Sequence, residues 1–320
     1  MSASSNWQFE PNEAFDMILF LNAMSDDPFY NQHYADVREK WGAKLGESGA
    51  ARIQRVRSMI SMSELCSEVS RLDIKTLDEM IGLFSNAGES SLMILGATLH
   101  AKRETFFQCF RLLKEIELDQ TWESRIKPYL LEMAQRYHLA INSEYSLSEI
   151  ENEIRTFLGA PHLICSKVYL STYIKPIAFR LPDGAMVMHP APNGQLQLPR
   201  HFAQLWLHES LHGFPDSEIA QNRQNELRKT NAPFEQRYEE LMSTYNSGPE
   251  EYFVVGAEAY LSSKLNIRTH EECMDYLARQ NGGMPLSLAI YKRLRETNPE
   301  QDSNWSGYGK WLDEQLMSLL

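Results

Sequence analysis

The chain has 320 residues, of which 43% are hydrophobic and 23% charged. This balance excludes a wholly disordered or fibrous protein and leaves enough chain for about two domains. The 31 Lys and Arg against 43 Asp and Glu give a formal net charge of −12. Because an acidic surface repels a phosphate backbone, we expect no nucleic-acid partner.

The N-terminus lacks the pattern of an export signal. It has no basic start, and Glu10 and Glu13 stand where a signal peptide would be apolar. The best early apolar run, at residues 15–24, contains Asp16 and is too short to cross a bilayer. We therefore expect a cytoplasmic protein without a membrane span.

Over residues 13–158 the apolar side chains recur at helical spacing, as in the series Leu77, Met80, Ile81 and Phe84. Clusters of turn residues interrupt this pattern and predict where the helices end. The breaks are predicted at residues 25–28, 46–49, 85–88 and 142–143. The sequence thus predicts a helical region, residues 1–158, made of several packed helices.

The pattern changes after Pro161. Short runs of β-branched and aromatic residues at 163–171, 177–181 and 185–189 predict a small antiparallel sheet between residues 162 and 198. Pro199 then opens a helix, and helices are predicted to follow through most of the remaining chain. The predicted fold is α+β and helix-dominated, with a second region at residues 159–320.

Residues 208–212 read His-Glu-Ser-Leu-His, which is the pattern H-E-x-x-H. Residues four apart lie on one face of a helix, so His208 and His212 can bind a single metal ion. Glu209 can reach a water molecule at the open position of that metal. A chain of this composition would contain the pattern by chance roughly 0.03 times. We therefore interpret it as a zinc site.

Through these five residues the chain resembles the zincin metallopeptidases. It is not similar to the metzincins, because Pro215 and Glu218 stand where that family has a glycine and a third histidine. The closer resemblance is to the gluzincins, and to uncharacterised bacterial proteins with this motif on a helical body. It implies a metallopeptidase with one Zn²⁺ per chain. It also implies a peptide or protein substrate that lies along a strand edge within residues 177–189.

In gluzincins the third zinc ligand is a glutamate from a later helix, which here corresponds to residues 248–265. Glu258 lies in the middle of that helix on an apolar face, where a lone carboxylate must find a cation or lose its charge, so it is the first choice. Glu251 lies on the same face seven residues earlier and is the fallback. The helix dipole also gives Glu250 and Glu251 a purely structural explanation.

The resemblance implies that Glu209 is the general base and then the proton shuttle of peptide-bond hydrolysis. A further donor is expected to stabilise the developing oxyanion. Tyr252 is the first candidate for it, and the others are Tyr245, Tyr260 and His270. For each tyrosine, aromatic packing is the competing explanation.

Two other classes of protein stay open. One is a zinc-binding interaction module without catalytic activity, which would keep the metal ligands but would not need Glu209. The other is a metal-free helical scaffold in which the H-E-x-x-H pattern is accidental.

Overall fold

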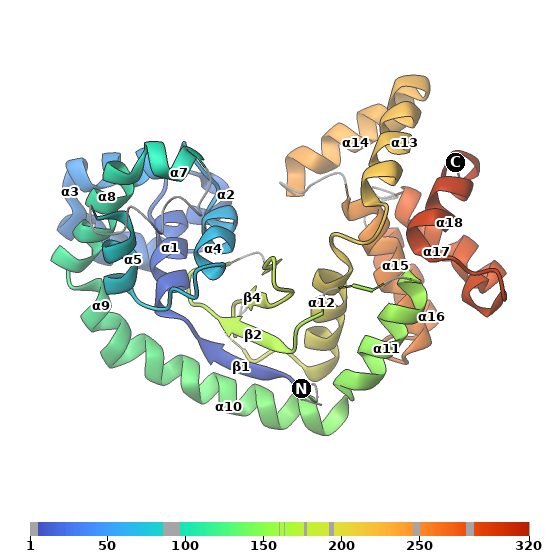
Figure 1. Ribbon diagram of the computed structural model, residues 1–320, viewed down its shortest axis with the longest axis horizontal. Coiled ribbons are helices and arrows are strands. Elements are labelled where there is room, and N and C mark those ends of the chain that lie inside the picture. Colours follow the sequence, from blue (N-terminus) through green and yellow to red (C-terminus); the bar gives the residue numbers. More distant parts are fainter. Residues whose placement is uncertain are drawn as a thin grey trace. The chain divides into compact units, whose positions relative to one another are not determined.

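The computed structural model describes residues 6–85, 97–159, 161–162, 164–175, 178–191, 195–245, 250–279 and 285–319. Within them the chain is helix-dominated and has one four-stranded sheet, which confirms the predicted α+β class (Figure 1). None of the helices in these ranges has the length and apolar character needed to cross a membrane. Leu163, Ile177 and most of the break predicted at residues 85–88 lie outside the described residues.

The chain forms two compact units whose limits differ from the two regions expected from the sequence. Unit 1 comprises residues 1–6, 144–164 and 198–320, and unit 2 comprises residues 7–143 and 165–197. The strand-forming segment therefore belongs with the N-terminal helices. The helix α11 (Leu147–Leu158) belongs instead with the C-terminal helices.

Unit 2 packs its helices around α1, in which every residue from Ala14 to Ala23 is buried. The break predicted at residues 46–49 is a kink inside α3 at Gly46, where φ is 60°, a value that glycine adopts without strain. The helices of this unit are α1 (Glu13–Ala23), α2 (Pro28–Asn31), α3 (Ala35–Arg57), α4 (Met62–Ser70), α5 (Leu77–Phe84), α7 (Ala97–Ala101), α8 (Arg103–Glu115), α9 (Leu118–Thr121), the π-helical η2 (Trp122–Ile126) and α10 (Lys127–Glu144).

The sheet of unit 2 is mixed, with the strand order β1-β2-β4-β3. β1 (Gln8–Pro11) is parallel to β2 (Lys167–Leu170), and β2 is parallel to β4 (Met186–Met188). Only β3 (Phe179–Arg180) is antiparallel to its neighbour β4. The prediction of an antiparallel sheet is therefore wrong. The N-terminal strand escaped notice because four residues that end in proline carry almost no periodic signal.

A buried carboxylate joins this sheet to the helices of unit 2. Asp16 has no exposed surface and accepts hydrogen bonds from Trp122 Nε1 at 2.8 Å, Ser171 Oγ at 2.6 Å and the Thr172 backbone N–H at 2.8 Å. Burial raises the pKa of Asp16 to about 6, and the three donors offset much of the cost of desolvating it. The end of β2 is thereby held against α1 and η2.

The described residues of unit 1 form helices joined by turns and loops, and α15 lies at its centre. Residues Tyr252 to Ser262 of α15 are all buried. Gly256 allows close approach of α17, because a Cβ atom there would lie 2.8 Å from Ile290 Cγ2. The helices are α11, α12 (Pro199–Leu211), α13 (Ser217–Thr230), α14 (Ala232–Tyr245), α15 (Glu251–Lys264), α16 (His270–Arg279), α17 (Pro285–Thr297), η3 (Pro299–Gln301), α18 (Tyr308–Gln315) and η4 (Leu316–Ser318).

Candidate metal centre

α12 carries the H-E-x-x-H residues at its C-terminal end. It begins at Pro199, as predicted, and buries Phe202 and Trp206 in unit 1. The helix ends at Leu211, so His212 is the C-cap residue, with extended backbone angles of φ −60° and ψ 143°. The pattern therefore ends just beyond the helix rather than inside it.

α12 and α15 pack against each other in antiparallel directions (Figure 1). The end of α12 meets the first turn of α15, where His208 lies near Glu251. One turn earlier on α12, Gln204 is a polar neighbour of Glu258, which lies two turns further along α15. The direction of packing thus decides which glutamate reaches the histidines.

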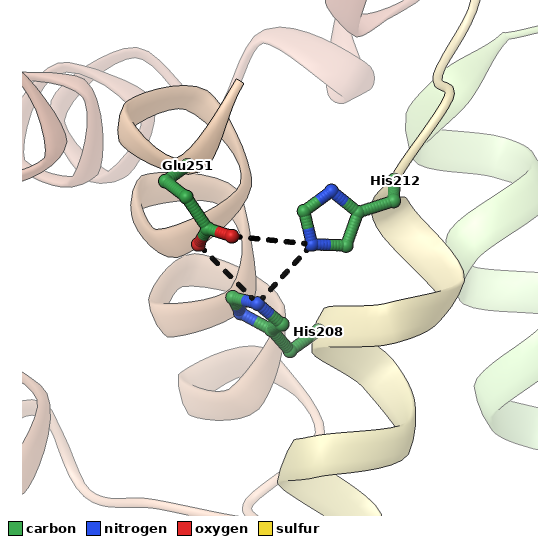
Figure 2. Close-up of side chains that lie close together, drawn as sticks. All are labelled: His208, His212 and Glu251. Carbon is green, nitrogen blue, oxygen red and sulfur yellow. Dashed lines mark hydrogen bonds and ion pairs between the residues drawn. The ribbon is translucent and has the colours of Figure 1, made fainter. Parts of the chain in front are cut away.

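Three side chains converge at this junction, as Figure 2 shows. The Nε2 atoms of His208 and His212 are 3.3 Å apart. In the carboxylate of Glu251, Oε2 lies 3.5 Å from His208 Nε2, and Oε1 lies 3.6 Å from His212 Nε2. The side chains are only partly buried, with 18%, 25% and 19% of their surface exposed in the order His208, His212, Glu251.

These separations fit a shared zinc ion. Zinc lies about 2.0–2.2 Å from nitrogen and oxygen ligands, so two ligands of a tetrahedral site are about 3.3–3.6 Å apart. The distance between the two histidine nitrogens falls in that interval, and each of them has one of the two Glu251 oxygens at a distance within it. One ligand atom from each of the three residues can be chosen so that all three atoms lie within 4.8 Å of one another. Among the residues that the structure describes, this is also the one group of three His, Cys, Asp or Glu side chains close enough to hold an ion. Two imidazoles and a carboxylate form a donor set that zinc accepts.

Glu250 holds His212 from the other side of the ring. Its Oε2 lies 3.3 Å from His212 Nδ1, and its Oε1 accepts a hydrogen bond of 3.0 Å from the Gly213 backbone N–H. A carboxylate on Nδ1 favours the tautomer whose Nε2 lone pair is available to a metal. The sequence interpretation gave Glu250 only a helix-dipole role and missed this contact. The one feature of the sequence that could have indicated this contact is that Glu250 directly precedes Glu251.

The electrostatics of the two histidines differ. Burial, and then the charge of His212, lower the pKa of His208 to about 3. Burial also lowers the pKa of His212, but the hydrogen bond to Glu250 and the charges of Glu209, Glu251 and Glu250 outweigh it and raise that pKa to about 9. The surrounding carboxylates thus favour positive charge at this point. A bound metal cation would satisfy the same preference.

Glu209 is buried in the last turn of α12, with 7% of its surface exposed. Its charge acts on His212, so it lies within electrostatic range of the candidate ligands. Burial beside apolar neighbours makes an ionised glutamate costly unless a cation or a donor compensates it. Its assignment as the general base stays a prediction.

The structure groups the fallback Glu251, and not the first choice Glu258, with the two histidines. Glu258 is fully buried, and its Oε1 accepts a hydrogen bond of 3.1 Å from Ser262. Burial raises its pKa to about 7. Residues Tyr252 to Ser262 of α15 are all buried, so burial alone does not indicate which glutamate of this helix lies near the histidines.

Tyr252 packs in an aromatic cluster. Its ring stacks on Tyr238 at 5.7 Å and lies 5.8 Å from Phe234. Its buried hydroxyl makes no hydrogen bond to a described residue, and burial raises its pKa. The proposed oxyanion role of Tyr252 thus finds no support in this geometry, whereas the competing role in aromatic packing does.

The other candidates for the oxyanion donor have partners of their own. The Tyr260 hydroxyl donates to Glu300, and His270 Nδ1 lies 2.8 Å from the Tyr291 hydroxyl. The side chain of Tyr245 lies outside the described residues, as do residues 248–249 of the expected ligand helix.

Comparison with known proteins adds no identification: no protein-family model, no curated protein and no solved structure matches the chain. The site must therefore be interpreted from its own geometry.

The contact between Glu250 and His212 leads to a first prediction. We expect Glu250→Ala to weaken zinc binding by about 10- to 100-fold, because His212 loses the carboxylate that fixes its tautomer and orientation. Titration against a chromophoric chelator measures the affinity. Glu271→Ala is the matched control, since Glu271 is an exposed first-turn glutamate of α16. Equal affinities of the two variants would contradict the role of Glu250.

Proposed function

We propose that this protein is a zinc-dependent hydrolase that cleaves peptide bonds. The observation that carries the proposal is the convergence of His208, His212 and Glu251 in a group that could hold a metal ion, with Glu209 close enough for its charge to act on His212. Structural zinc sites are closed by four protein ligands, whereas catalytic sites have three and keep one position for water or substrate. The partial exposure of all three side chains is consistent with such an open position.

Zinc held by these residues would polarise a substrate carbonyl and make a water molecule a stronger nucleophile. The chain itself supplies the proton transfers. Glu209 can accept a proton from the attacking water and later deliver it to the leaving amine. Glu250 keeps the His212 ring oriented during these steps, since it holds both the ring and the following backbone N–H.

A peptide substrate is supported by the resemblance of the H-E-x-x-H pattern to the gluzincins. The gluzincins take their third ligand from a helix that comes later in the chain and packs against the first. Glu251 comes from such a helix.

The experiment that tests the proposal is the zinc content of the protein purified without chelator or nickel resin, measured by inductively coupled plasma mass spectrometry. We expect about one zinc per chain, and cleavage of a peptide library that stops when a chelator removes the metal. Absence of zinc, with no uptake when it is offered at neutral pH, would refute the proposal. Stoichiometric zinc without cleavage of any peptide would favour the non-catalytic interaction module.

A further inference from the structure

The last turn of α12 depends on a side chain from another part of unit 1. α12 ends at Leu211, and the backbone of the next residue, His212, is extended, with ψ at 143°. The carbonyl groups in the last turn of a helix have no N–H partner within that helix, so they need one from elsewhere. The carbonyl oxygen of Ser210 has such a partner in His162, whose Nε2 atom lies 2.7 Å away.

His162 and Ser210 are both buried, with 8% and 4% of their surface exposed. A carbonyl oxygen accepts hydrogen bonds and cannot donate them, so the Nε2 atom of His162 carries the hydrogen and donates it. Removing the donor would take away the partner of a buried carbonyl group, which costs more than the hydrogen bond itself contributes. The contact therefore restrains the end of α12.

The backbone at His162 is itself anchored to α11. This helix is followed by Gly159 in the left-handed region, at φ 66°, whose N–H donates to the Arg155 carbonyl at 3.0 Å. The side chain of Arg155 reaches forward along the chain, and its Nη1 donates to the backbone carbonyl of His162 at 2.9 Å. His162 is thus held by α11 while its ring holds the end of α12.

Glu250 holds the same turn on its other side. Its carboxylate accepts the Gly213 N–H at 3.0 Å, directly after His212, whereas His162 bonds the carbonyl two residues before it. Because His212 lies just outside the helix, regular helix geometry does not fix the position of its ring. The distance of 3.3 Å between the Nε2 atoms of His208 and His212 therefore depends on this turn.

We propose that His162 is a positioning residue of the candidate metal centre, which acts through the Ser210 carbonyl. By fixing the last turn of α12, it sets the place of the His212 ring relative to His208 before a metal binds. Ligands that are already in place bind a metal more tightly, because less conformational freedom is lost on binding. The inference rests on the metal centre of the proposed function and gives His162 no part in proton transfer.

Two substitutions of His162 test whether its donor is what matters. The amide N–H of glutamine reaches about as far from the backbone as Nε2 of histidine, whereas the shorter asparagine cannot reach the Ser210 carbonyl. We expect His162→Asn to weaken zinc binding about tenfold, and His162→Gln to stay within about threefold of the unaltered protein. Competition with a chromophoric chelator measures these affinities. The matched control is His201→Asn, which replaces an exposed histidine near the start of α12 and should bind zinc normally.

Hydrogen exchange of the metal-free protein tests the same contact without zinc. We expect the Gly213 amide to exchange at least about fivefold faster in His162→Asn than in the unaltered protein, because the last turn is released. The Trp206 amide, in the interior of α12, should keep its rate, and His162→Gln should restore slow exchange at Gly213. A general loss of stability would instead raise the exchange rates of both amides together.

Unchanged zinc affinity in His162→Asn, an equal loss in His162→Gln, or faster exchange at both amides would each overturn the proposal. Absence of zinc from the unaltered protein would refute the proposed function, and the exchange rates would then still decide whether His162 holds the turn. If His162→Asn does not fold, the Nε2–H proton of His162 in the unaltered protein decides. Slow exchange of this proton with solvent supports its bond to Ser210, and fast exchange contradicts it.

Discussion

Glu251→Ala is expected to weaken zinc binding by at least about 100-fold, a loss larger than that of an orienting residue, because it removes one of three ligands. Glu258→Gln is the matched control, since both glutamates belong to α15 and only Glu251 lies with the histidines. We expect its zinc affinity to stay within about threefold of the unaltered protein. Competition with a chromophoric chelator measures both affinities at the same pH.

The control variant Glu258→Gln should fold well, because the native structure already favours the uncharged form of this side chain. Its pKa is raised by burial from 4.5 to about 7 in the native state, so the native protein binds this proton more tightly than the unfolded chain does. The stability that the group contributes therefore falls as the pH rises from about 4.5 to 7. Glutamine removes this loss, so the variant should be at least as stable as the unaltered protein at pH 8, as thermal unfolding can show. Loss of zinc from Glu258→Gln, with zinc kept by Glu251→Ala, would reverse the assignment.

Glu209→Gln is expected to keep its zinc and to lose peptidase activity by about 1000-fold, because the amide has the shape of the carboxylate and cannot accept the proton. The measurement is kcat/KM on the best peptide from the library, with zinc content determined on the same samples. Retained zinc would separate loss of the base from loss of the metal.

Glu218→Gln is the matched control for this experiment. Glu218 is an exposed glutamate in the first turn of α13, and its replacement should leave both zinc content and kcat/KM unchanged. Full activity in Glu209→Gln would contradict the assignment of Glu209 as the general base. A large loss in both variants would point to a general effect of charge on the fold and not to proton transfer.

Local periodicity was enough to predict several features of this protein. The helical pattern of the N-terminal half, the helix start at Pro199 and the strand segments before it all appear in the structure. Each depends on residues within a few positions of one another, so short-range sequence carries the information. The predicted proximity of His208 and His212 held for the same reason, although the helix ends at Leu211.

The sheet shows where this local information ends. β1 comes from residues near the N-terminus and pairs with β2 more than 150 residues later, as in the register Gln8 with Lys167. Nothing in either short segment specifies the other as its partner. The network around the buried Asp16 selects the arrangement, and it is assembled from α1, η2 and the residues after β2.

The residues of the candidate metal centre also fall into two groups: those predicted from local sequence and those that only the tertiary structure identified. The amino-acid sequence by itself determined the two histidines and Glu209, because their spacing along one helix turn is a local property. The resemblance to the gluzincins restricted the candidates for a third ligand to one later helix, but only the tertiary structure placed Glu251, and not Glu258, near the histidines and brought Glu250 to His212. The reason is physical: two residues seven apart share a helix face, and the offset at which that face meets α12 is set by the packing of unit 1 as a whole.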